Sequence, residues 1–97
     1  MMTFICYLSF TEQGVKAIKD VVKRYEASKK LVERLGGRTV CTYVTTGQYD
    51  AIQVIEMPNG DAMAKFSATL GARGFVRTIT VRGFTPEEFG KLVADLK

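Results

Sequence analysis

The 97-residue sequence predicts a single α+β domain, in which a four-stranded antiparallel sheet carries its helices on one face. Two observations indicate this class. Four stretches rich in β-branched and aromatic residues are separated by two longer segments with helical periodicity. Their order is strand, helix, strand, strand, helix, strand, and a short third helix follows. This order is the split βαβ arrangement of ferredoxin-like folds.

The first predicted strand covers Met2 to Phe10 and places one apolar set on a single face: Phe4, Cys6, Leu8 and Phe10. Thr11 suits the N-cap of the next helix, and Gly36-Gly37 is typical of its end. The apolar residues between them recur at near-helical spacing: Val15, Ile18, Val22, Tyr25, Val32 and Leu35. We therefore expect one long helix that packs against the sheet.

A hairpin is predicted in the middle of the chain, with strands over residues 38–45 and 51–57. Gly47 can adopt a positive φ in the connecting turn. The carboxylate of Asp50 can accept hydrogen bonds from nearby backbone N–H groups. Tyr49 is large for a turn residue, so we expect its ring to cover one end of the sheet.

The last third of the chain is predicted to hold a helix, a strand and a further helix. Asn59 can cap the first of these helices, whose buried residues would be Met63, Phe66 and Leu70. A strand follows over residues 75–83. The stretch Thr85-Pro86-Glu87-Glu88 then has the pattern of a capping box that opens the final helix.

Composition excludes several classes of function. The chain has no histidine, and Cys6 and Cys41 are predicted on opposite faces of the sheet, so we expect no metal, haem or other cofactor. The net charge of +4 is concentrated on the first long helix without a reading motif, which favours a solvated surface over nucleic-acid binding. No signal peptide or membrane span is predicted, and we expect a cytoplasmic protein.

The helices of this fold leave one sheet face uncovered, and its composition is polar but nearly uncharged in the predicted register. Such a face is typical of a partly buried surface or a pocket wall, so we expect a homodimer or higher oligomer. The face is predicted to contain Ile5, Tyr7, Ser9, Thr39, Cys41, Tyr43, Thr45, Gln53, Ile55, Thr78, Thr80 and Arg82.

The residues Gly47-Gln48-Tyr49-Asp50 resemble the signature of the GYD domain family, within the ferredoxin-like dimeric α/β barrel group. The resemblance covers nearly the whole chain and includes Thr11-Glu12-Gln13-Gly14-Val15, Leu35-Gly36-Gly37, Arg77-Thr78 and Phe84-Thr85. The chain has Val21-Val22 where many members carry Ser-Pro. A similar Gly-x-Tyr-Asp hairpin occurs in the effector-binding domains of leucine-responsive regulators, where the loop region helps to bind amino acids between subunits; that resemblance is shorter and less specific.

This resemblance implies a protein that binds a small organic ligand in a pocket between the sheets of a homo-oligomer. The alternative is a cofactor-independent monooxygenase or isomerase that uses Tyr, Asp and Arg; the missing histidine counts against it, and no catalytic residue is assigned. Each candidate also has a structural interpretation, as an interface hydrogen bond, a packing ring or a turn cap. The candidate ligand-binding residues are Tyr7, Ser9, Tyr43, Tyr49, Asp50, Gln53, Thr78 and Arg82.

Overall fold

The computed structural model describes residues 1–97 and confirms the ferredoxin-like α+β fold. The four strands form one sheet in the order β2-β3-β1-β4, and all neighbours are antiparallel. The elements are β1 (Met2–Phe10), α1 (Glu12–Lys16), a 3₁₀ turn (Ile18–Asp20), α2 (Val21–Arg34), β2 (Arg38–Val44), β3 (Ala51–Met57), α3 (Gly60–Arg73), β4 (Val76–Gly83) and α4 (Pro86–Val93).

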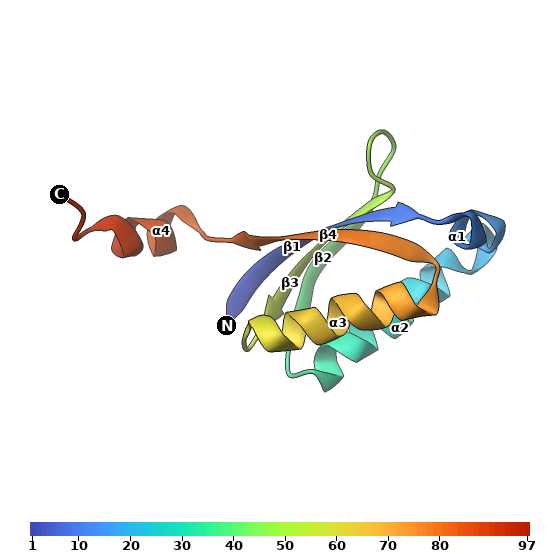
Figure 1. Cartoon of the computed structure of the whole chain (residues 1–97), viewed down its shortest axis with the longest axis horizontal. Coiled ribbons are helices and arrows are strands. Elements are labelled where there is room, and N and C mark those ends of the chain that lie inside the picture. Colours follow the sequence, from blue (N-terminus) through green and yellow to red (C-terminus); the bar gives the residue numbers. More distant parts are fainter.

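Two helices, α2 and α3, cover one face of the sheet, and the opposite face carries no helix (Figure 1). The core lies between these layers. Phe66 of α3 and Ile55 and Met57 of β3 are fully buried in it. Met63 and Leu70 lie on the same side of α3 as Phe66 and are also buried, which confirms the predicted stripe of this helix.

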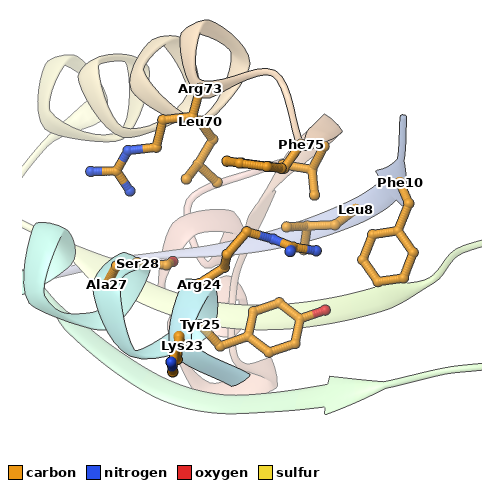
Figure 2. A pocket seen from close by; sticks show the side chains of 11 residues that line it. Leu8, Phe10, Lys23, Arg24, Tyr25, Ala27, Ser28, Leu70, Arg73 and Phe75 are labelled. Atoms are coloured by element: carbon orange, nitrogen blue, oxygen red, sulfur yellow. The ribbon is translucent and has the colours of Figure 1, made fainter. Parts of the chain in front are cut away.

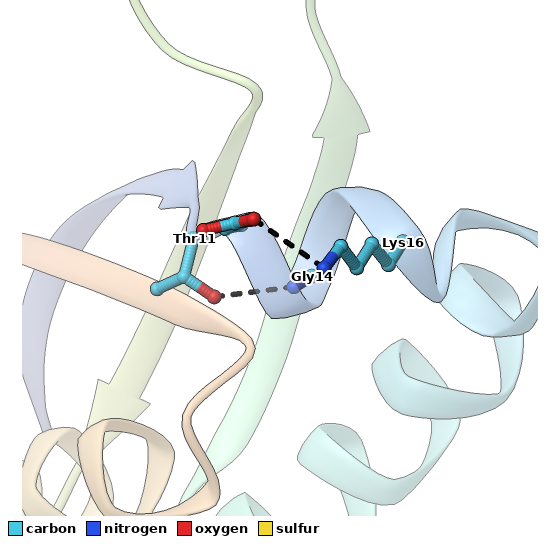
Figure 3. A network of polar contacts seen from close by, with 4 residues as sticks. Thr11, Gly14 and Lys16 are labelled. Carbon is cyan, nitrogen blue, oxygen red and sulfur yellow. Dashed lines mark hydrogen bonds and ion pairs between the residues drawn. The ribbon is translucent and has the colours of Figure 1, made fainter.

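The predicted long first helix is wrong, because the chain bends at Ala17 and divides into α1, the 3₁₀ turn and α2. Thr11 caps α1 by accepting a hydrogen bond from the Gly14 N–H, and Lys16 pairs with Glu12 on the same short helix (Figure 3). The Thr11 hydroxyl also donates to the Gly74 carbonyl at 2.6 Å. This second bond ties α1 to the start of β4 rather than to the sheet face.

The bend at Ala17 changes which apolar residues are buried. Val15, Ile18 and Val22 were expected to pack on the sheet, but all three are exposed. Val32 is fully buried in the core, and Leu35 packs against it. Only the second half of the predicted apolar stripe therefore faces the sheet.

The predicted faces of β3 and β4 are inverted. Residues that are directly opposite in an antiparallel pair share one face of the sheet. The β1 residues Phe4 and Cys6, which face the helices, are opposite Ile55 and Gln53 on β3. On β4, the residues opposite Phe4, Cys6 and Leu8 are Arg82, Thr80 and Thr78.

On β2, an irregularity between Thr39 and Cys41 shifts the register, so Thr39 also turns to the helix side, opposite Ile55. Cys41 and Tyr43 remain on the uncovered side, opposite Val54 and Ile52. Since Cys6 faces the helices, the two cysteines lie on opposite faces as predicted, and both are free thiols.

The final helix, α4, lies beyond the end of the sheet and extends away from the rest of the molecule (Figure 1). Its capping box is formed as predicted, since Thr85 and Glu88 exchange side-chain and backbone hydrogen bonds of 3.0 Å each. The radius of gyration, 14.7 Å, exceeds the roughly 13 Å of a compact domain of this length, in keeping with this extension. No helix in the chain has the length and apolar composition to cross a bilayer.

Candidate functional site

The uncovered sheet face is built from two complete rows of residues that run across all four strands. One row is Tyr43, Ile52, Tyr7 and Ile79, and the next is Cys41, Val54, Ile5 and Val81. We call these eight residues the open face. Tyr43, Ile79 and Val81 are 66%, 54% and 42% exposed. The open face is thus strongly apolar, whereas the predicted face was polar.

Polar residues border the open face at both ends. Beyond the Val54 row, Arg38 and Glu56 are opposite each other and form an ion pair of 2.7 Å. Beyond the Tyr7 row, Ser9 is opposite Arg77. An apolar centre with a polar border is the usual anatomy of a protein interface.

The hairpin loop contributes an aromatic side chain to the end of the open face where Tyr7 and Ser9 lie. The ring of Tyr49 stacks on Tyr7 with 4.8 Å between the ring centroids. Gly47 has a φ of +117°, as the turn requires, and the Thr45 hydroxyl donates to the Tyr49 carbonyl. Four of the predicted ligand residues, Tyr7, Ser9, Tyr43 and Tyr49, therefore lie at one end of one face.

Asp50 was predicted to cap its own turn, but its carboxylate caps the end of β1. Its Oδ2 accepts a hydrogen bond of 2.7 Å from the Phe10 N–H, across 40 residues of sequence. The Asp50 N–H donates to the Leu8 carbonyl. This carboxylate fastens the base of the hairpin to the end of β1 and does not cap its own turn.

The other three predicted ligand residues lie on the helix side of the sheet, so their placement on the uncovered face is wrong. Gln53 is buried, with its Nε2 3.4 Å from the Thr42 hydroxyl and its Oε1 without a partner. Thr78 is opposite Leu8, under the helices. Arg82 places its guanidinium over the ring of Phe84, 4.2 Å from the centroid, and donates to the Thr3 carbonyl. The eight predicted ligand residues do not form a single site.

Both cysteines are free thiols, and Cys6 is the buried one. Burial raises the pKa of the Cys6 thiol, and a hydrogen bond from Thr80 opposes this effect. A thiol with a raised pKa is a poor nucleophile at neutral pH. No three Cys, Asp or Glu side chains lie close enough together to hold a metal ion.

A cavity of about 250 Å³ lies on the helix side, between α2, α3 and the sheet (Figure 2). Its walls include Leu8 and Val76 from the sheet and Leu70 from α3. No pattern in the sequence predicts this cavity directly. Its only local signal is that Arg24 and Ser28 interrupt the apolar pattern of α2 on the side that faces the sheet.

Arg24 lies in this cavity as a fixed positive charge. Its guanidinium donates to the Ala17 carbonyl at 2.6 Å and to the Gly14 carbonyl at 3.4 Å. The same group lies over the ring of Phe75, 4.7 Å from the centroid. Burial raises the pKa of the neighbouring Tyr25 hydroxyl; the charge of Arg24 opposes this shift, and that of Asp50 adds to it.

Comparison with known proteins places this chain among relatives of the same size. Residues 4–93 match the model of the GYD domain. A protein from Thermus thermophilus, named glutamine synthetase and cystathionine beta-lyase binding protein, is 30% identical over 98 residues, with 100% of both chains covered. The crystal structure of TTHA0845, also from Thermus thermophilus, is similar in fold, with a TM-score of 0.55, 18% identity and coverage of 88% of this chain and 95% of that chain.

Proposed function

The chain belongs to the GYD domain family, and we propose that it is a homodimeric binding module that pairs through its open face and recognises another protein. The open face is the observation that carries this proposal. Monomeric proteins rarely leave contiguous apolar patches of this kind in water, and large exposed patches mark interaction sites. A domain of 97 residues also gains stability when it buries more apolar area by pairing.

The shape of the open face favours a second copy of the chain as its partner. In a dimer with two-fold symmetry the same patch meets itself, so the Tyr7 row and the Val54 row can pack on their own copies. The Arg38–Glu56 pair then lies at the rim, where charges remain hydrated. Two sheets packed face to face are about 10 Å apart, and aromatic and β-branched side chains fill that space.

The protein partner is inferred from the Thermus relative and from α4. That relative is named for binding glutamine synthetase and cystathionine beta-lyase, and its alignment covers this entire chain, α4 included. The helix extends away from the body of the domain (Figure 1), and its residues Phe89 and Leu92 are 52% and 56% exposed. An amphipathic helix with an unpaired apolar side is a common element of protein recognition.

A second candidate function is binding of a small organic ligand between the paired sheets, and the stacked rings of Tyr7 and Tyr49 favour it. These two rings, together with the residues Ser9 and Tyr43, lie at the hairpin end of the open face, where Tyr49 would close the inter-sheet space. Binding of such a ligand would require the dimer, so a variant that cannot dimerise should not bind the ligand.

The dimer is tested by replacing Val54, at the centre of the open face, with lysine. We expect the wild-type protein to sediment as a dimer at micromolar concentration and Val54→Lys to sediment as a monomer, because an unpaired buried charge costs several kcal/mol. Val44→Lys is the matched control, since Val44 is 64% exposed but lies on the other face, opposite Ala51. A monomeric wild-type protein, or two variants that dissociate equally, would refute the dimer.

Recognition of another protein is tested by calorimetric titration of the dimer into purified glutamine synthetase and cystathionine beta-lyase from the same organism. We expect at least one enzyme to bind. Leu92→Gln should weaken that binding about tenfold or more, since apolar anchors dominate such interfaces. Glu87→Gln, on the same helix in an exposed ion pair, should leave it unchanged. Absence of binding to both enzymes would contradict this part of the proposal.

A further inference from the structure

The cavity between α2, α3 and the sheet combines an apolar interior with a cationic rim. Figure 2 shows side chains of α2 facing Leu70 and Phe75 across the space. Seven of the eleven lining residues are hydrophobic, so the interior favours an apolar group over a sugar or a nucleotide base. The lining residues are Leu8, Phe10, Lys23, Arg24, Tyr25, Ala27, Ser28, Leu70, Arg73, Phe75 and Val76.

The charges around the cavity have one sign. Lys23, Arg24 and Arg73 line it, and no Asp or Glu does. None of the three cations lies within ion-pair distance of a carboxylate; the chain's ion pairs are elsewhere, Lys16–Glu12, Arg38–Glu56 and Lys91–Glu87. Asp50 lies close enough to Tyr25 to affect its pKa, but its Oδ2 is already bonded to the Phe10 N–H. The rim therefore has positive charge without an internal counter-ion.

Two hydroxyl groups on α2 also lack partners. Ser28 is 4% exposed, lines the cavity, and its Oγ makes no hydrogen bond. The Tyr25 hydroxyl is buried and unpaired in the same way. A buried polar group without a partner costs free energy, and a ligand oxygen that accepts from it would remove that cost.

Arg24 is held in position before any ligand arrives. Two neutral carbonyls fix its guanidinium and the Phe75 ring supports it, so these contacts orient the charge without neutralising it. Guanidinium groups bind carboxylates through charge-assisted hydrogen bonds. A preorganised donor also loses little conformational entropy on binding.

We propose that this cavity binds a small monocarboxylate with a compact apolar body, such as an aromatic or branched-chain acid. The apolar body lies against Leu8, Leu70 and Phe75, and the carboxylate lies near Arg24 and the buried Ser28 hydroxyl. Size supports a compact ligand, because an apolar cavity of roughly 150 Å³ holds benzene, and about 250 Å³ leaves room for a ring and a short acidic side group.

This site is independent of the proposed dimer, since all of its lining residues belong to one chain and none is in the open face. The Val54→Lys variant should therefore bind the same acid as the wild-type protein. If the dimer is refuted, the cavity can still be tested, and the reverse also holds.

The test uses phenylacetate as the probe. Its binding is monitored by the changes in backbone amide chemical shifts and by scanning calorimetry. We expect shifts centred on Ser28, Leu70 and Val76, and a thermal midpoint that rises with concentration. The neutral analogue phenylacetamide should bind with an affinity that is lower by about tenfold or more, because it lacks the charge that Arg24 recognises. Inorganic phosphate, which has charge but no apolar body, should not bind in the cavity.

Three variants distinguish binding of phenylacetate in the cavity from non-specific electrostatic binding of an anion to the surface. Ser28→Leu should fill the space and abolish binding while the protein stays folded. Arg73→Gln should weaken binding severalfold without disturbing the Arg24 contacts. Lys29→Gln, an exposed cation on α2 outside the cavity, should leave affinity unchanged. The proposal is overturned if phenylacetamide binds as well as phenylacetate, if Ser28→Leu binds normally, or if phenylacetate does not bind at about 10 mM.

Discussion

Replacing Phe66 with alanine should lower the free energy of unfolding by about 3–5 kcal/mol, the usual cost of truncating a fully buried phenylalanine. Phe66 is the largest side chain of the core with no exposed surface, and it lies between α3 and the sheet. Truncation removes apolar area from the core and leaves a cavity that the sheet cannot collapse to fill. Since small domains are stable by only about 5–15 kcal/mol, this variant should be close to unfolding.

Phe89→Ala is the matched control for this substitution. Phe89 lies on α4, is 52% exposed and contacts Phe84, its neighbour at the end of β4, edge to face. Its loss should hardly change the unfolding free energy of the isolated domain. Chemical denaturation of both variants measures the difference, and equal losses would show that α4 packs on the core in solution, contrary to the structure.

Replacing Gly14 with alanine should destabilise the protein by about 3 kcal/mol or more, because overpacking against fixed backbone is among the most costly substitutions. A Cβ atom at Gly14 would overlap the carbonyl oxygen of Phe75. That carbonyl cannot move freely, since it accepts a hydrogen bond of 3.1 Å from the Thr11 N–H. The substitution would therefore separate α1 from the start of β4.

Gly71→Ala, at a second helical glycine, should change the stability in the opposite direction. Apart from the adjoining residues and the backbone of α3 itself, no atom lies within 4 Å of a Cβ at Gly71, in the last part of α3. Alanine there should raise stability by about 0.5–1 kcal/mol, because it restricts the unfolded chain and favours the helix. Thermal unfolding of the two variants should shift in opposite directions, and a shift of the same sign in both would contradict the close contact at Gly14.

Features that depend on a few neighbouring residues could be predicted from the sequence. The caps at Thr11, Asn59 and Thr85 are formed as expected, since each side chain bonds to an N–H three residues further along. Gly36 and Gly47 have the positive φ values that their turns require. The order of elements follows from these local signals together with hydrophobic periodicity, and it is sufficient to specify the fold class.

The faces of β3 and β4 could not be predicted in this way, because alternation divides a strand into two sets without stating which set is buried. Ile52 and Val54 are as apolar as Ala51 and Ile55, so both assignments of β3 fit the pattern. We expected the purely apolar sets to face the helices. The register of β3 and β4 against β1 determines which set faces the helices, and it places Gln53, Thr78 and Arg82 on the helix side.

The sequence alone therefore determined the four strands, the order of strands and helices and the helix caps at Thr11, Asn59 and Thr85. The tertiary structure alone decided the register of the sheet, the bend at Ala17, the 40-residue reach of Asp50 to Phe10 and the cavity beside Arg24. These features depend on groups that are distant in sequence and meet only when the strands pair and α2 and α3 pack on the sheet. Pairing and packing energies across such distances do not appear in a local pattern.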